Sequence, residues 1–127
     1  LHGNIFNCGC LTCSFESPTL DFYEKNKNEV DMLCPSCLEG LIKVKTISFG
    51  QSLDQNILSI AHQVSAKAKN FIVMGSSLKV SPANSFIKVA KANKAKIIIL
   101  NKDKTPFDDY ADIVINDDLE NIYEQIK

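Results

Sequence analysis

The second part of the chain alternates between hydrophobic patterns typical of helices and of buried strands. Apolar residues recur at helical spacing over residues 53–68, and Ser52 and Gln55 have the spacing of a capping box at the start of that helix. Residues 71–74 form a continuous apolar run, and residues 96–100 form a second one after a leading lysine. Such runs are typical of strands that are buried on both faces of a parallel sheet.

A second helix is predicted between these two strands, capped by Ser81 with Pro82 at its first position. A third short strand is predicted at residues 113–115, and a last amphipathic helix follows it. The expected inner faces are Ala83, Phe86, Ile87 and Ala90 in the second helix, and Leu119, Ile122, Tyr123 and Ile126 in the last one. The alternation predicts an α/β fold with a parallel sheet and helices on both faces.

The first part of the chain carries a cysteine pattern. Cys10, Cys13, Cys34 and Cys37 form two C-x2-C pairs that are separated by 20 residues, a spacing typical of a zinc ribbon. Four thiolates complete the tetrahedral coordination of zinc and leave no position for water, so such a site is structural. Two alternatives stay open: the pairs could form disulfides, and Cys8 could replace Cys10 as a ligand.

The segments around the cysteines extend this module. Residues 14–33 are polar, with a stretch at 20–29 that can form a short helix, and residues 40–49 are mostly β-favouring. We therefore predict a small metal-held module over residues 8–47, followed by the sheet-forming part.

Composition excludes several classes of protein. The 127 residues are 45% hydrophobic and 23% charged, which is typical of a globular domain. The net charge is −1, and no apolar run approaches the length of a membrane span. The start of the chain also lacks a signal-peptide pattern. We expect a cytoplasmic protein that binds neither nucleic acid directly nor a membrane.

Polar residues follow the two buried strands at their carboxyl ends. Gly75, Ser76 and Ser77 come after the first strand, and Asn101 and Lys102 come after the second. Ligands of open parallel sheets bind at this edge, and small residues allow a sugar or phosphate to approach the backbone closely. The alternative is that Gly-Ser-Ser is an ordinary turn.

Taken together, these residues resemble the sirtuins, the NAD-dependent protein deacylases. His2-Gly3 resembles the pair that holds the family's catalytic histidine, and the four cysteines match its zinc thiolates with Cys10 in register. The segment Ile47-Ser48-Phe49-Gly50-Gln51 is similar to V-x-F-G-E, which pairs with the substrate peptide. The segment from Gly75 to Ala83 is similar to G-[TS]-S-L-x-V-x-P-A, the most specific match. Further matches are the strand Ile98-Ile99-Leu100-Asn101 and the pair Asp118-Leu119.

The resemblance implies a set of roles. His2 would be the general base, and Ile47, Phe49, Gly50 and Val80 would contact an acyl-lysine peptide or protein. NAD would be held by Gly75, Ser76, Ser77, Asn101, Lys102, Asp118 and Leu119, and zinc by Cys10, Cys13, Cys34 and Cys37. The implied reaction removes acyl groups from lysine side chains and releases nicotinamide and O-acyl-ADP-ribose.

The chain also departs from the family pattern. Gln51 stands where a Glu is usual, and Val44 stands where a Pro is common. The family's first NAD motif, G-A-G-I-S, is absent from these residues, so the chain resembles the later half of a catalytic domain. Residues 1–7 would then carry the catalytic histidine, and residues 48–127 would form the second half of a Rossmann-like domain. We expect this chain alone to be inactive.

Two other functions stay open at this stage. One is a zinc-ribbon module that binds proteins without catalysis. The other is an NAD hydrolase or ADP-ribosyl transferase on the same scaffold. His2 and the peptide-strand segment favour the deacylase.

Overall fold

A computed structural model describes the backbone of residues 1–127 and every side chain except that of Ile126. The expected place of Ile126 on the apolar side of the last helix therefore lies outside the described side chains. The chain divides into two compact units: one spans His2–Leu53, and the other spans Asp54–Lys127 together with Leu1. The functional division at residues 7–8 and 47–48 stays a prediction.

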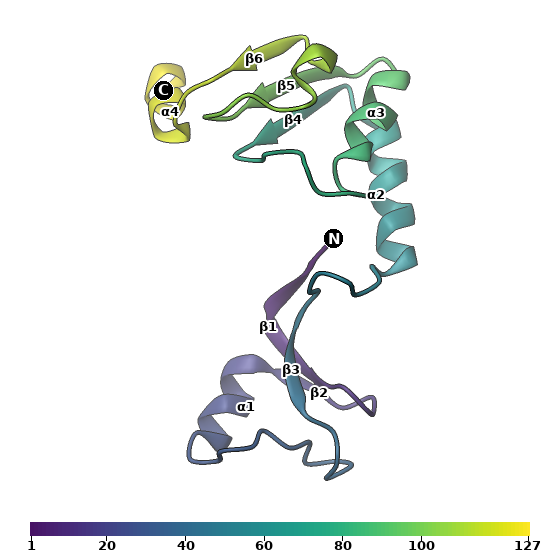
Figure 1. The fold of residues 1–127 in the computed structure, drawn as a ribbon, viewed down its shortest axis with the longest axis vertical. Coiled ribbons are helices and arrows are strands. Elements are labelled where there is room, and N and C mark those ends of the chain that lie inside the picture. The colour runs from purple at the N-terminus through teal and green to yellow at the C-terminus, as the bar shows by residue number, and fades with distance from the viewer. The chain divides into compact units, whose positions relative to one another are not determined.

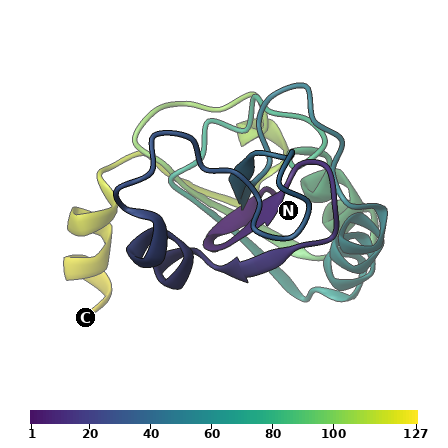
Figure 2. The same cartoon turned by 90° about the horizontal axis from the view of Figure 1, so that it is seen from below.

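The first unit is built on an antiparallel sheet of three strands. Strand β1 (Gly3–Cys10) lies in the centre and pairs with β2 (Glu16–Pro18) on one side and β3 (Ile42–Thr46) on the other. Helix α1 (Thr19–Asn26) follows β2 directly, as Figures 1 and 2 show, and confirms the short helix expected in this polar segment. Strand β3 likewise confirms the central part of the β-favouring segment at residues 40–49, although the strand ends at Thr46 and a turn follows.

A small core holds this unit together. Phe22 of α1 is buried and meets the rings of Phe15 and Tyr23 edge to face. Cys8, Cys34 and Ile42 are buried in the same cluster. This core is small, which is the situation in which a bound metal adds most to the stability of a fold.

The second unit confirms the predicted order of helices and strands. The elements are α2 (Gln55–Lys67), β4 (Asn70–Met74), α3 (Ser85–Ala92), β5 (Lys96–Leu100), a short 3-10 helix η1 (Asp108–Tyr110), β6 (Ile113–Ile115) and α4 (Leu119–Ile126). The strands form a parallel sheet in the order β4-β5-β6. Helices α2 and α3 pack against one another (Figure 1).

Two helix starts differ from the prediction. Helix α2 is capped by Asp54 and not by Ser52: one carboxylate oxygen of Asp54 accepts hydrogen bonds from the amides of Asn56 (2.7 Å) and Ile57 (3.1 Å). A carboxylate satisfies the free amides and also complements the positive end of the helix. The predicted start of α3 at Ser81 is wrong too, because a turn intervenes and the helix begins at Ser85.

The core of the second unit lies between α3 and one face of the sheet. Ile87 and Ala90 of α3 are buried against Ile97 and Ile99 of β5, and Val73 of β4 joins them. This confirms Phe86, Ile87 and Ala90 of the predicted inner face of the second helix, whereas Ala83 is half-buried and precedes α3. In β5 one face is buried, through Ile97 and Ile99, and the other is half-buried.

The other face of β4 is open, so the expected burial of this strand on both faces is wrong. Ile72 and Met74 are 55% and 60% exposed, respectively. Side chains alternate between the two faces of a strand, so the same strand buries Val73 and exposes its neighbours. No described helix is long and apolar enough to cross a membrane.

Candidate functional site

Four cysteines meet at one point in the first unit. The Sγ atoms of Cys10, Cys13, Cys34 and Cys37 all lie within 4.8 Å of one another. Two contacts link the C-x2-C pairs, Cys10 to Cys37 at 3.7 Å and Cys13 to Cys34 at 3.6 Å. All five cysteines of the chain are free thiols, so the disulfide alternative is not supported. Four converging soft ligands suit zinc.

Backbone amides point at these sulfur atoms. Cys10 Sγ accepts hydrogen bonds from the amides of Thr12 (3.3 Å) and Cys13 (3.4 Å), and Cys37 Sγ accepts one from Gly40 (3.4 Å). The amides of Glu39 and Gly40 lower the pKa of Cys37 to about 6. Amide donors favour the thiolate, which is the form that binds a metal.

Gly40 is a residue of this site that the motif search missed. A Cβ atom at this position would lie 2.3 Å from Cys10 Sγ and 2.8 Å from the Thr12 hydroxyl. The Gly40 carbonyl also accepts a hydrogen bond of 2.7 Å from the amide of Cys34. A side chain at this position would therefore displace the Cys10 thiol. Only the close approach of these two distant segments in the structure reveals the requirement for glycine.

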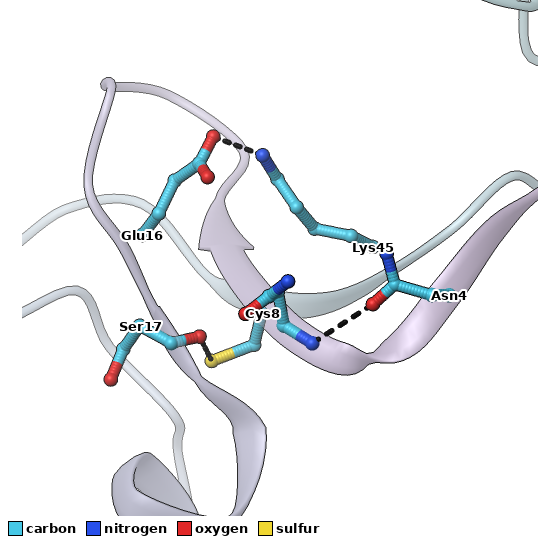
Figure 3. Close-up of polar contacts among 6 residues, drawn as sticks. Asn4, Cys8, Glu16, Ser17 and Lys45 are labelled. Atoms are coloured by element: carbon cyan, nitrogen blue, oxygen red, sulfur yellow. Dashed lines mark hydrogen bonds and ion pairs between the residues drawn. The ribbon is translucent and has the colours of Figure 1, made fainter.

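Cys8 lies outside the cluster. Its side chain is fully buried, and its Sγ donates a hydrogen bond of 3.5 Å to the carbonyl of Ser17, as Figure 3 shows. Burial raises the pKa of the Cys8 thiol. The alternative in which Cys8 replaces Cys10 as a ligand is therefore not supported, because Cys8 is a neutral core residue.

The structure joins His2 to the predicted substrate strand. The His2 carbonyl accepts a hydrogen bond of 2.9 Å from the amide of Ile47, and the next residue, Gly3, pairs with Thr46. Gly3 has a φ of +74°, and a Cβ there would lie 1.8 Å from the Lys45 carbonyl oxygen. A glycine after the histidine is thus required by close backbone contact.

The predicted substrate strand continues into a turn. The amide of Gln51 donates to the Ser48 carbonyl (3.0 Å), and the amide of Ser48 donates to Gln51 Oε1 (2.7 Å). Phe49 at this turn is 94% exposed, and Gly50 has a φ of +86°. Phe49 is therefore available to a ligand and is not a core residue. Val80, the remaining predicted substrate contact, lies in the second unit and is also exposed.

A hollow of about 500 Å³ lies at the carboxyl ends of the strands in the second unit. Five of the seven predicted cofactor residues line it, and Ser76 and Ser77 do not. Its lining residues are Gly75, Asn101, Lys102, Asp117, Asp118, Leu119, Glu120 and Asn121. The position agrees with the rule that open parallel sheets bind ligands at this edge.

The hollow has a fixed polar wall. Asn101 is nearly buried, and its side-chain amide donates 2.7 Å to the carbonyl of Asp103. The main-chain carbonyl of Asn101 accepts a hydrogen bond of 3.0 Å from the side-chain amide of Asn116. Lys102, after β5, forms an ion pair of 3.1 Å with Asp118, which precedes α4. These bonds hold Asn101 in a defined orientation.

Three lining residues were not predicted: Asp117, Glu120 and Asn121. Asp117 Oδ1 accepts from the side chain of Asn121 (2.8 Å) and from the amide of Asp118 (2.7 Å), and these bonds lower the pKa of Asp117. The signal available in the sequence was the Asn116-Asp117-Asp118 run directly before a helix, which is typical of a helix start.

Comparison with known proteins defines the class. The Sir2 family profile matches residues 1–82. An NAD-dependent protein deacetylase of Shouchella clausii is 46% identical over 118 residues, which cover 92% of this chain and 46% of that protein. One of Thermotoga maritima is 34% identical over 119 residues, covering 94% of this chain and 48% of that protein. The chain belongs to the Sir2 family, the sirtuins, and spans about half the length of the curated relatives it matches.

Solved structures agree in fold. A Sir2 protein in complex with a p53 peptide and NAD+ superposes with a TM-score of 0.90 at 32% identity, covering 99% of this chain and 52% of that one. A Sir2 protein bound to an acetylated peptide gives a TM-score of 0.91 at 32% identity, with coverage of 99% and 52%. The mixed α/β fold with a four-cysteine cluster is therefore that of the later half of a sirtuin domain.

Proposed function

We propose that this chain forms the later half of an NAD-dependent protein lysine deacylase. The observation that carries the proposal is the pairing of His2 with Ile47, which joins the predicted base to the predicted substrate strand by a hydrogen bond of 2.9 Å. Both residues lie inside the part of the chain that matches the Sir2 family.

His2 would act as the general base. A neutral imidazole accepts a proton near neutral pH, and positioned bases of this kind contribute about 10²–10⁴ in rate. The proton would come from a ribose hydroxyl of the bound dinucleotide. The His2 side chain is exposed, so it is accessible to a ligand, while its main chain is fixed by Ile47.

The peptide substrate would add as a strand along residues 47–50. Strand addition uses backbone donors and acceptors, which give affinity with little demand on the peptide sequence. The turn at residues 48–51 would therefore have to extend when the peptide binds. The exposed ring of Phe49 would cover the methylene groups of the acyl-lysine. The solved relatives that contain acetylated or p53 peptides support a peptide ligand of this kind.

The adenosine part of NAD would bind in the hollow at the strand ends. Asn101 would present its amide to the ribose, and Asp118 and Leu119 would border the adenine, as the resemblance implies. When bound, NAD would supply the ribose carbon that the acyl oxygen attacks as the bond to nicotinamide breaks. The acidic lining suits hydroxyl and amino donors of a nucleoside.

Zinc would be held by the four clustered cysteines and would have a structural role. Four thiolates fill the tetrahedral coordination of zinc, so no position remains for water or substrate. The cluster joins the loop after β1 to the segment before β3, and these two strands position His2 and Ile47. Loss of the metal would therefore disturb the catalytic histidine indirectly.

One assay separates the deacylase from its two alternatives. Nicotinamide release is measured for the natural protein that contains this chain, with and without an acetyl-lysine peptide. A deacylase releases nicotinamide only with the acylated peptide and yields the free lysine in equal amount. Release that does not require the peptide would instead indicate an NAD hydrolase. No release under either condition would favour a binding module.

A further inference from the structure

Lys43 occupies a position that links the two ends of the predicted substrate strand. It lies in β3, and its Nζ donates to the carbonyls of Thr46 and Val44 (3.4 Å) and to Gln51 Oε1 (3.5 Å). Thr46 precedes residues 47–50 and Gln51 follows them. The ammonium group therefore lies beside the segment along which the peptide is proposed to pair.

The charge of Lys43 is not neutralised in this unit. Its acceptors are two backbone carbonyls and a carboxamide, all of which are uncharged. Among the described residues, Lys43 has no carboxylate within ion-pair distance, whereas Lys45 on the same strand pairs with Glu16 (Figure 3). A positive charge thus remains at the substrate strand.

Gln51 is the reason why the charge persists. Its Oε1 accepts hydrogen bonds from both the Ser48 amide (2.7 Å) and Lys43 Nζ. A glutamate could accept the same two bonds, but it would also cancel the lysine charge. The neutral carboxamide keeps the turn closed and leaves the ammonium group unpaired.

We propose that Lys43 is a specificity-determining residue that favours acyl-lysine peptides with Asp or Glu beside the modified lysine. This inference rests on the proposed pairing of the peptide with residues 47–50. A peptide bound there would place the side chains that flank its modified lysine near Lys43 Nζ. The attraction between these exposed charges acts through solvent, so it is modest and is screened by salt. The preference is therefore about two- to fivefold in affinity at low salt.

The test compares two labelled acetyl-lysine peptides that differ only in their flanking residues, Asp in one and Asn in the other. Binding to the zinc-loaded natural protein is measured by fluorescence anisotropy at about 0.01 M and about 0.5 M salt. The Asp peptide binds about two- to fivefold more tightly at low salt, and the two peptides bind equally at high salt.

Variants identify the charge responsible. Lys43→Met and Gln51→Glu each bring the affinity ratio to about one, while Lys43→Arg retains it. Lys27→Met is the matched control, because it removes the same charge from an exposed position of the same unit outside the sheet, and it leaves the ratio unchanged. Zinc content confirms that each variant is folded. If Lys43→Met loses zinc, Gln51→Glu and Lys43→Arg carry the test.

The outcomes separate this inference from the proposed function. If the wild-type protein binds neither peptide, the assignment of residues 47–50 as the peptide-binding segment is contradicted. The proposed role of Lys43, which rests on that assignment, is then contradicted as well. If both peptides bind equally at low salt, only the specificity of Lys43 is overturned. A ratio that persists in Lys43→Met also overturns it, because the preference would then come from another group.

Discussion

The main-chain carbonyl of His2 accepts a hydrogen bond of 2.9 Å from the amide of Ile47. Residues 45 positions apart are thereby joined at the end of one sheet. The positive φ of Gly3, the residue after His2, makes this link possible. The histidine is thus placed by backbone contacts of the unit that contains the four clustered cysteines, whatever contacts its imidazole makes with a ligand.

Gly3→Ala tests this placement. The added Cβ would lie 1.8 Å from the Lys45 carbonyl, and a left-handed φ costs an alanine about 1–2 kcal/mol. We expect faster amide hydrogen exchange at Ile47 and a loss of activity, with zinc retained. Gly9→Ala on the same strand is the control, since its Cβ would come no closer than 3.3 Å to a neighbouring atom. Unchanged exchange at Ile47 in Gly3→Ala would contradict the account.

Zinc binding distinguishes the five cysteines. Structural zinc contributes about 10–16 kcal/mol of apparent binding free energy in small peptides, so Cys34→Ala should lose the metal and unfold the first unit. Cys8→Ser should keep one zinc per chain, because the Cys8 thiol bonds to Ser17 and not to the cluster. Elemental analysis of freshly purified protein checks both. A Cys8→Ser protein without zinc, beside a Cys10→Ser protein with it, would reverse the assignment.

Asn101→Ala should weaken NAD binding. The side chain is held against the Asp103 carbonyl and lines the hollow, so its removal takes away an oriented polar group. We expect about a tenfold loss of affinity, which equals roughly 1.4 kcal/mol, with an unchanged zinc content. Calorimetry with the natural protein measures it. An NAD affinity equal to that of wild type would contradict the assignment of Asn101 as an NAD-binding residue.

Acid should destabilise the second unit through Asp112. The Lys91 ammonium (2.8 Å) and the amide of Ile97 hold the pKa of Asp112 below its usual value. A lowered folded-state pKa gives stability that is present above about pH 4 and is lost as the pH falls through the folded pKa.

Asp112→Asn should therefore lower the stability of the second unit at pH 7 and have less effect near pH 3. Unfolding is followed by the methyl signals of Ile97, because acid also releases zinc from the first unit and would disturb a global probe. Parallel pH curves for wild type and Asp112→Asn would show that this carboxylate does not contribute.

Local patterns predicted much of this structure. The cysteine spacing identified the four clustered thiols, and apolar periodicity placed the helices and strands of the second unit. Features that depend on contacts between distant segments could not be predicted from the sequence. In the sequence, Gly40 was only the first residue of a β-favouring segment, and its close approach to Cys10 is evident only in the structure. Asp117 required knowledge of where the strand ends meet α4.

The open face of β4 illustrates a different limit. The continuous apolar run at residues 71–74 is typical of a strand that is buried on both faces. In the described structure, however, Ile72 and Met74 of this run are exposed. Parallel strands are normally covered on both faces, and the chain matches about half the length of its relatives. An apolar pattern predicts that a strand favours burial. It does not indicate whether the segment that covers the strand lies within the same stretch of sequence.

The most direct test of the account is deacylation by the natural protein that contains this chain, with His2 replaced. Conversion of an acetyl-lysine peptide to free lysine is measured by mass spectrometry for wild type, His2→Ala and the control His62→Ala, whose histidine is exposed on α2. His2→Ala should lose about 10²–10⁴ in rate, while peptide and NAD affinities and the His62→Ala rate change little. A His2→Ala protein with the wild-type rate would contradict the assignment of His2 as the general base.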